Sequence, residues 1–158
     1  MSEFSENDFK QVLRSHLSNF TNISTLKAEQ EICIKSIVQR KDVFGILPTG
    51  FGKSLIFQLL PRVLRDLWKV EQATVIVVTP LISIMRDQVK ELKEKGMKAF
   101  ALGDEDDEKD LEDKGYEAEI VYGSAERFLC ETWQRRLREG KLHVAVVVID
   151  EVHSVSLW

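Results

Sequence analysis

The stretch that decides the fold is Val43–Ser54, which reads VFGILPTGFGKS. Val43–Leu47 is short and apolar, and this predicts a buried strand. Pro48–Gly52 is rich in proline and glycine and suits neither a helix nor a strand interior, so we expect a loop there and a helix from Lys53. A glycine-rich loop between a buried strand and a helix is the setting in which proteins bind phosphate groups.

The residue types of this loop fit a polyphosphate ligand. Glycines let the backbone N–H groups approach the phosphates, and the N-terminus of the following helix adds positive potential. We expect Lys53 to reach the β and γ phosphates of a nucleotide and Ser54 to offer its hydroxyl to Mg²⁺. The alternative is an ordinary glycine-rich turn beside a lysine. The loop residues predicted to bind the nucleotide are Pro48, Thr49, Gly50, Phe51, Gly52, Lys53 and Ser54.

The rest of the chain alternates between short apolar runs and amphipathic segments, after two helical segments at its start. Continuous apolar strands separated by helices indicate a parallel sheet that is buried on both faces. We therefore predict an α/β fold, a mainly parallel sheet with helices on both faces. Ser5 is a candidate cap for the first helix. Helices are predicted at 6–17, 27–39, 82–95 and 126–138, and strands at 74–79, 98–102, 119–122 and 144–149.

Composition restricts the classes of protein that remain. The 158 residues carry 22 basic and 26 acidic side chains, and eight of the acids lie in Asp104–Lys114, which predicts a solvated loop or a short surface helix. Cys33 and Cys130 have no metal-binding spacing, so no disulfide framework or zinc site is expected. There is no apolar run near the ~20 residues that a membrane helix needs. The polar, acidic start is unlike a secretory signal, and we expect an intracellular protein without a membrane partner.

The strand Val144–Ile149 ends in two adjacent carboxylates, Asp150 and Glu151, followed by His153. The carboxyl ends of parallel strands gather at one edge of a sheet, beside the phosphate loop. Two carboxylates after an apolar strand are costly to desolvate unless a cation meets them. We expect Asp150 to hold Mg²⁺ through water and Glu151 to orient or deprotonate the attacking water. The alternative is a polar loop that merely follows a strand.

Together these motifs resemble motifs one and two of superfamily-two helicases, and further segments resemble the RecQ family of DNA helicases. The most specific match is Thr79–Val89, TPLISIMRDQV, which is similar to motif Ia of that family. Leu26–Gln30 resembles motif zero, with Lys27 where an arginine is usual. Tyr122–Arg127 is similar to motif Ib. Ser154–Trp158 resembles the start of the aromatic-rich loop that couples single-strand binding to hydrolysis.

The resemblance implies a RecA-like P-loop domain that uses ATP and Mg²⁺ and binds DNA, single-stranded or forked, with unwinding in the 3′ to 5′ direction. It places Lys27 and Gln30 at the nucleotide, and Lys53, Asp150, Glu151 and His153 in the catalytic machinery. His153 links the nucleotide site to the neighbouring domain. The residues that it places at DNA are Thr79, Pro80, Ser83, Gln88, Ser124, Glu126 and Trp158.

The domain organisation follows from the same resemblance. We expect an N-terminal helical extension over residues 1–20 and the first RecA-like helicase domain over 21–158, truncated after motif two, without the second RecA-like domain and its arginine finger. Such a chain binds nucleotide and DNA weakly and does not unwind. The family is implied to work in DNA repair and recombination, in the nucleus if the source is eukaryotic.

One alternative remains open. The chain could be a nucleotide-binding or protein-interaction module without a motor, which contacts a basic partner through the acidic segment Asp104–Asp113. The basic clusters are more typical of solvated helix faces than of DNA-binding platforms, because no aromatic residues are interleaved with them. These clusters are Arg135, Arg136, Arg138 and Lys141, and Lys90, Lys93, Lys95 and Lys98.

Overall fold

The structure is a computed structural model, and it describes residues 4–20, 23, 25–43, 52–80, 82–114, 117–140 and 142–150. Two compact units make up the chain, Met1–Glu71 and Gln72–Trp158. The boundary lies at Glu71, and the expected division at residue 20 stays a prediction. Most of the predicted strand Val43–Leu47 lies outside the described residues. None of the described helices is long and apolar enough to cross a membrane.

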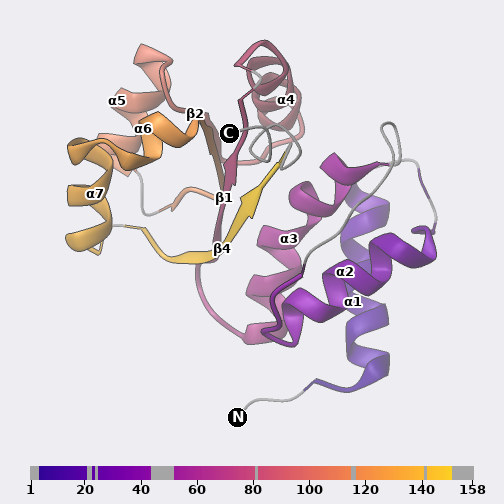
Figure 1. Cartoon of the computed structure of the whole chain (residues 1–158). Helices are drawn as coiled ribbons and strands as arrows, with labels where there is room; N and C mark the ends of the chain where they lie inside the picture. Colours follow the sequence, from indigo (N-terminus) through magenta and orange to yellow (C-terminus); the bar gives the residue numbers. More distant parts are fainter. Residues whose placement is uncertain are drawn as a thin grey trace. The chain divides into compact units, whose positions relative to one another are not determined.

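The described residues of the first unit form three helices (Figure 1): α1 (Glu6–Phe20), α2 (Ala28–Val38) and α3 (Lys53–Trp68). The predicted cap of α1 is confirmed, because the Ser5 hydroxyl accepts a hydrogen bond from the Asp8 backbone N–H at 3.0 Å. Apolar residues at helical spacing bury one face of each helix, and both α1 and α2 pack against α3. The buried side chains include Phe9, Leu13, Leu17, Ile34, Val38, Leu60, Val63 and Leu64.

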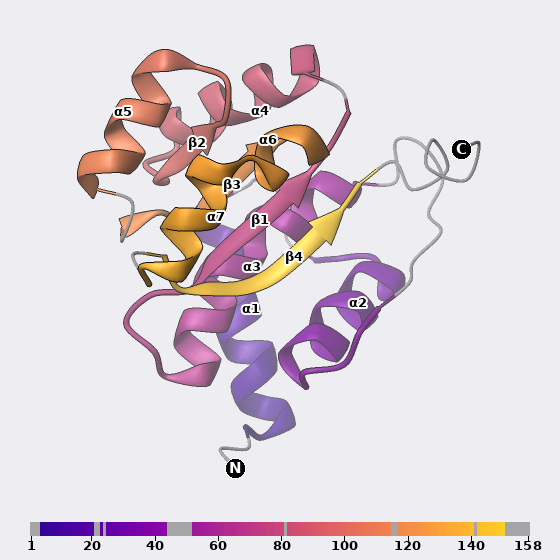
Figure 2. The same cartoon turned by 60° about the vertical axis from the view of Figure 1, so that its left-hand side comes forward.

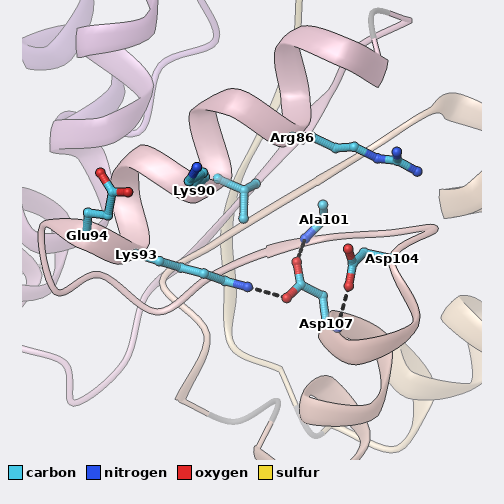
Figure 3. Close-up of a pocket in the computed structure, with 8 residues that line it drawn as sticks. Arg86, Lys90, Lys93, Glu94, Ala101, Asp104 and Asp107 are labelled. Carbon is cyan, nitrogen blue, oxygen red and sulfur yellow. Dashed lines mark hydrogen bonds and ion pairs between the residues drawn. The ribbon is translucent and has the colours of Figure 1, made fainter.

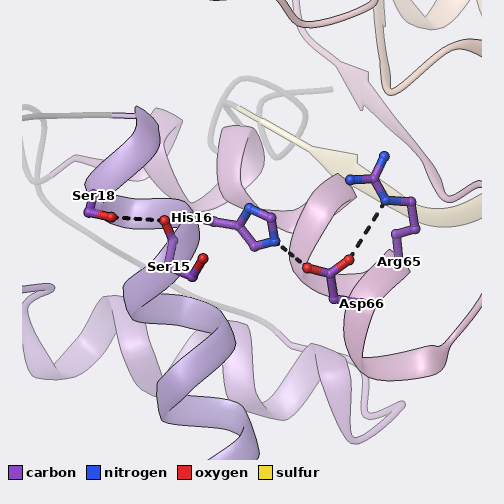
Figure 4. Close-up of polar contacts among 5 residues, drawn as sticks. All are labelled: Ser15, His16, Ser18, Arg65 and Asp66. Atoms are coloured by element: carbon purple, nitrogen blue, oxygen red, sulfur yellow. Dashed lines mark hydrogen bonds and ion pairs between the residues drawn. The ribbon is translucent and has the colours of Figure 1, made fainter.

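Polar contacts add to this packing. The His16 ring on α1 lies 2.5 Å from the Asp66 carboxylate on α3, and Arg65 lies 3.8 Å from the same carboxylate (Figure 4). The Trp68 indole N–H donates to the Val38 carbonyl at 2.9 Å, which satisfies a carbonyl at the end of α2. The His16 contact joins α1 to α3 and the Trp68 contact joins α3 to α2, whereas Arg65 and Asp66 both belong to α3.

The second unit is built on a four-stranded sheet in the order β2-β3-β1-β4, and every neighbouring pair is parallel. The strands are β1 (Thr74–Val78), β2 (Ala99–Ala101), β3 (Ile120–Gly123) and β4 (Val144–Ile149). The connecting helices are α4 (Ile82–Glu94), α5 (Glu105–Lys114), α6 (Ala125–Leu129) and α7 (Glu131–Arg138). Parallel neighbours need crossover connections, and these helices provide them.

Helices cover both faces of this sheet, as predicted. Figure 2 shows α6 and α7 in front of the strands and α4 behind them. On the α6–α7 face, Ile76, Phe100 and Val121 pack with Phe128 and Trp133. The opposite face meets α4, which buries Met85, Val89 and Leu92 and contacts β2 and β3. The α/β fold class is confirmed.

Two expectations about this unit are wrong. The predicted helix over 126–138 is two helices, because Cys130 is extended, with φ −69° and ψ 157°. Phe128 and Trp133 are five residues apart, about 140° around a continuous helix. The break lets both rings enter one core, where their centroids lie 5.0 Å apart in an edge-to-face arrangement.

The expectation that every strand is buried on both faces fails for β4. Val147 is 57% exposed and Ile149 is 56% exposed, whereas the residues of β1 to β3 are buried almost throughout. Among the described strands, β4 pairs with β1 alone. Within the described sheet β4 is therefore an edge strand, and its exposed Val147 and Ile149 lie two residues apart on one face.

Candidate nucleotide and nucleic-acid site

The predicted phosphate-binding helix is confirmed as α3, which begins at Lys53. Gly52 precedes it with φ +92°, a left-handed conformation that favours glycine. The N–H groups of the first turn of a helix carry partial positive charge, so they suit an anionic ligand. Lys53 and Ser54 are half-buried in this first turn. Pro48, Thr49, Gly50 and Phe51 lie outside the described residues.

Gln30 brings the predicted motif zero to the phosphate loop. Its side-chain nitrogen donates to the Gly52 carbonyl at 3.0 Å, and its side-chain oxygen accepts the backbone N–H of Lys27 at 2.9 Å. The side chain is 4% exposed. A Cβ on Gly52 would lie 2.5 Å from this nitrogen, so the backbone at Gly52 approaches Gln30 as only glycine allows. The structure therefore brings Lys27 and Gln30 to Gly52, which follows Gln30 by 22 residues in the sequence.

These residues fit a nucleotide phosphate chain. A glycine with positive φ, a helix N-terminus, an ammonium group and a hydroxyl follow one another at residues 52–54. That set supplies backbone donors, a positive charge and an oxygen ligand for Mg²⁺. Ser54 belongs to the first unit and Asp150 to the second, so the shared magnesium site predicted for them stays a prediction.

The second unit gathers the predicted DNA-contact motifs at the carboxyl edge of its sheet. The Thr79 N–H donates to the Gly123 carbonyl at 2.9 Å, which places the end of β1 beside the end of β3. The Asp150 N–H donates to the Val78 carbonyl at 2.9 Å, which places the end of β4 beside the same strand. Thr79, Ser124 and Asp150 therefore share one edge, as the parallel order predicts.

The remaining predicted DNA contacts differ in exposure. Pro80, Ser83 and Glu126 are exposed, and Gln88 is half-buried on α4. The Ser124 hydroxyl accepts the Arg127 backbone N–H at 3.3 Å and caps α6, a local structural role that the sequence did not assign to it. Glu151, His153 and Trp158 lie outside the described residues.

Two charged residues that the sequence placed in solvated segments are buried and organise this unit, so the expectation of solvation is wrong for them. Asp107 is 4% exposed on α5, accepts the Ala101 N–H at 2.8 Å and pairs with Lys93 of α4. Arg136 on α7 is 7% exposed and reaches Glu112 of α5 at 2.6 Å. The spacing of Asp104 and Asp107 is the sequence signal that could have identified Asp107. Asp104 accepts the Asp107 N–H at 3.1 Å, as the cap of a helix does.

A parallel sheet flanked by helices and a Gly-Lys-Ser sequence at a helix N-terminus define a P-loop protein of the RecA-like class. The chain belongs to the DEAD/DEAH box helicase family, whose model matches residues 27–158.

Similar proteins confirm the resemblance to RecQ-type helicases. The probable ATP-dependent DNA helicase RecS of Bacillus subtilis is 33% identical over 92% of this chain and 28% of its own length. The ATP-dependent helicase SGS1 of Saccharomyces cerevisiae is 36% identical over 79% of this chain and 9% of its own length. The ATP-dependent helicase wrn-1 of Caenorhabditis elegans is 28% identical over 90% of this chain and 13% of its own length. The chain spans less than a third of each of these relatives.

Proposed function

We propose that this chain is the ATP-binding motor domain of a RecQ-type DNA helicase, in which ATP hydrolysis drives DNA unwinding in the 3′ to 5′ direction. The observation that carries the proposal is Gly52, with φ +92° at the start of α3, immediately before Lys53 and Ser54. The names of the relatives, ATP-dependent helicases, support the use of ATP.

The roles of the site residues follow from their chemistry. Lys53 contacts the β and γ phosphates, and the Ser54 hydroxyl and Asp150 hold Mg²⁺, which neutralises phosphate charge. Glu151 orients or deprotonates the attacking water, and His153 links the nucleotide site to the neighbouring domain. Lys27 and Gln30 face the base. The Gln30 contact with Gly52 then joins base recognition to the phosphate loop.

DNA, single-stranded or forked, is the proposed partner of the carboxyl edge of the sheet in the second unit. Thr79 and Ser83 contact the backbone at the start of α4, where free N–H groups favour phosphate. Pro80, Gln88, Ser124, Glu126 and Trp158 complete the proposed DNA surface. A role in DNA repair and recombination, inside the cell and in the nucleus of a eukaryote, belongs to the same proposal.

A second RecA-like domain is part of the proposed working helicase. In P-loop enzymes an arginine supplied by a neighbouring domain or protein accelerates hydrolysis by about 10³ to 10⁵. We therefore propose that residues 1–158 alone bind nucleotide and DNA weakly and do not unwind.

The alternative of an interaction module that uses Asp104–Asp113 has less support. In that segment Asp107 pairs with Lys93 and Glu112 pairs with Arg136, so two of its acids hold the fold together. These contacts explain part of the acidic segment without a basic partner.

A calorimetric titration of Mg-ATP and Mg-ADP tests the nucleotide proposal. Lys53→Ala removes the proposed phosphate contact, and Lys41→Ala removes an exposed lysine of the same unit as a matched control. We expect binding to be lost in Lys53→Ala and kept in Lys41→Ala. Equal binding by both variants would contradict the assigned role of Lys53, and no binding by the folded wild type would favour a fold without a working motor site.

A further inference from the structure

A pocket of about 400 Å³ lies in the second unit (Figure 3). One wall is a face of α4, from Arg86 to Glu94, and the other is the segment Ala101–Asp107 that joins β2 to α5. None of the residues predicted to bind the nucleotide or DNA lines it, although Arg86 and Val89 belong to the segment that resembles motif Ia. α4 begins just after Thr79 and Pro80, which are proposed to contact DNA. The pocket therefore lies along the helix that follows this proposed contact.

The carboxylates on the floor of this pocket are engaged in internal contacts. Asp107 pairs with Lys93 through one oxygen and accepts the Ala101 N–H at 2.8 Å through the other. Asp104 accepts the Asp107 N–H at 3.1 Å and caps α5. Figure 3 shows both carboxylates turned to these partners, with Glu94 at the opposite end of α4 from Arg86.

The basic cluster over residues 90–98 divides into paired and unpaired members. Lys93 pairs with Asp107, Lys95 with Glu91 at 3.2 Å, and Lys98 with Glu117 at 3.7 Å. Within the part of the chain that the structure describes, neither Lys90 nor Arg86 forms an ion pair, and both side chains are exposed. Arg86 and Lys90 are four residues apart, so they lie one helical turn apart on the same face of α4.

Arg86 and Lys90 are therefore cations that line the cavity outside the ion pairs of the described residues, and Glu94 lies one helical turn beyond Lys90. A guanidinium can form two parallel hydrogen bonds with a phosphate, and an ammonium is a compact positive charge. The ligand that the Arg86 and Lys90 side chains suit is therefore a phosphate group of another molecule.

We propose that Arg86 and Lys90 bind phosphates of the DNA strand that contacts Thr79 and Ser83, so that the DNA-binding surface continues along α4 into this pocket. The inference rests on the proposed function, because a DNA strand at the start of α4 is its premise. It adds two contacts that the motif pattern did not assign.

The test is fluorescence anisotropy with a labelled single-stranded oligothymidylate, titrated with the chain at several salt concentrations. The variant Arg86→Gln/Lys90→Gln removes both cations. The matched control, Arg138→Gln/Lys109→Gln, removes one arginine and one lysine that are exposed and do not line the pocket. Circular dichroism and a Mg-ATP titration of every variant report on the fold and on the nucleotide site separately.

Each lost phosphate contact lowers the slope of log K against log salt by about 0.7 for single strands. We therefore expect the slope to fall by about 1.4 in the Arg86/Lys90 variant, with weaker DNA binding and unchanged Mg-ATP binding. The control should keep the wild-type slope. An unchanged slope in the Arg86/Lys90 variant, or an equal loss in the control, would overturn the inference.

Two further outcomes separate the sources of phosphate and the two proposals. If inorganic tripolyphosphate binds the wild type, and the Arg86/Lys90 variant loses that binding but keeps DNA binding, the pocket holds a free polyphosphate and the DNA assignment is wrong. If the folded wild type binds no DNA, the DNA part of the proposed function fails together with this inference. The Mg-ATP titration then decides the nucleotide part independently.

Discussion

The side-chain nitrogen of Gln30 donates a hydrogen bond to the carbonyl of Gly52, 3.0 Å away, at the point where the phosphate loop meets α3. The same Gln30 amide accepts the Lys27 N–H and is almost fully buried. One side chain thus joins the start of α2 to the start of α3. The conformation of the loop end therefore depends on a residue in another helix.

Gly52→Ala should lower the free energy of unfolding by about 1 to 3 kcal/mol, the cost of holding a residue in a sparsely populated backbone conformation. Its Cβ would also displace the Gln30 amide, which lies 2.5 Å from that position. Urea denaturation measures the loss, and a Mg-ATP titration of the folded variant should show weaker binding.

Gly96→Ala is the control for backbone strain alone. Gly96 has φ +83°, and nothing lies within 4 Å of the position of its Cβ. Equal destabilisation by the two substitutions would mean that the Gln30 contact contributes nothing at Gly52. A larger loss in Gly52→Ala, reduced when Gln30→Ala is added, is the expected result.

Asp107→Ala should destabilise the second unit by about 1 to 3 kcal/mol, because it leaves the buried N–H of Ala101 without an acceptor. Asp107→Asn is the matched variant, since its amide oxygen can still accept that bond. The Lys93 side chain is 44% exposed, so losing its charge partner costs at most about 1 kcal/mol. Thermal or urea unfolding measures both variants. If Asp107→Asn is as unstable as Asp107→Ala, the assigned role of the hydrogen bond to Ala101 is wrong.

The Glu6 carboxyl should titrate below its usual range. A hydrogen bond from Lys35 is the main cause of its lowered pKa. Desolvation opposes it, and the smaller effects of the Lys35 and Lys10 charges lower the pKa further. A lowered pKa in the folded state stabilises the fold above the unfolded pKa, and this contribution is lost as the pH falls through the folded pKa.

Carboxyl NMR titration measures this pKa directly. Lys35→Gln should raise the pKa of Glu6, because it removes the hydrogen bond, and Lys10→Gln should raise it less, because only a more distant charge is lost. The interpretation is wrong if the two variants shift the pKa equally.

The two thiols should react at different rates. Burial raises the pKa of the Cys33 thiol, and its side chain is half-buried on α2, whereas Cys130 is exposed at the break between α6 and α7. Since the thiolate is the nucleophile, iodoacetamide should modify Cys130 first. Mass spectrometry over time checks the order, and Cys130→Ser should leave one slow thiol. If iodoacetamide modifies both thiols at the same rate, Cys33 is more accessible than its position on α2 indicates.

The sequence by itself determined the alternation of helices and strands, the parallel α/β class and the helix that starts at Lys53. These features depend on local patterns, since apolar periodicity sets which face of a segment is buried and glycine and proline mark its ends. The gathering of the carboxyl ends of parallel strands at one edge also followed, and the ends of β1, β3 and β4 lie side by side there.

Only the tertiary structure decided the break at Cys130, the exposure of β4 and the pairing of buried charges. The rings of Phe128 and Trp133 would point in different directions on one continuous helix, and the break at Cys130 lets both enter the same core. The sequence pattern around Cys130 did not indicate this break. Likewise, whether a lysine is solvated or paired depends on which carboxylate the fold brings to it. Lys93 meets Asp107, 14 residues away, whereas Lys90, on the same helix, faces the pocket. Contacts of this kind arise from packing between elements, so local sequence patterns do not contain them.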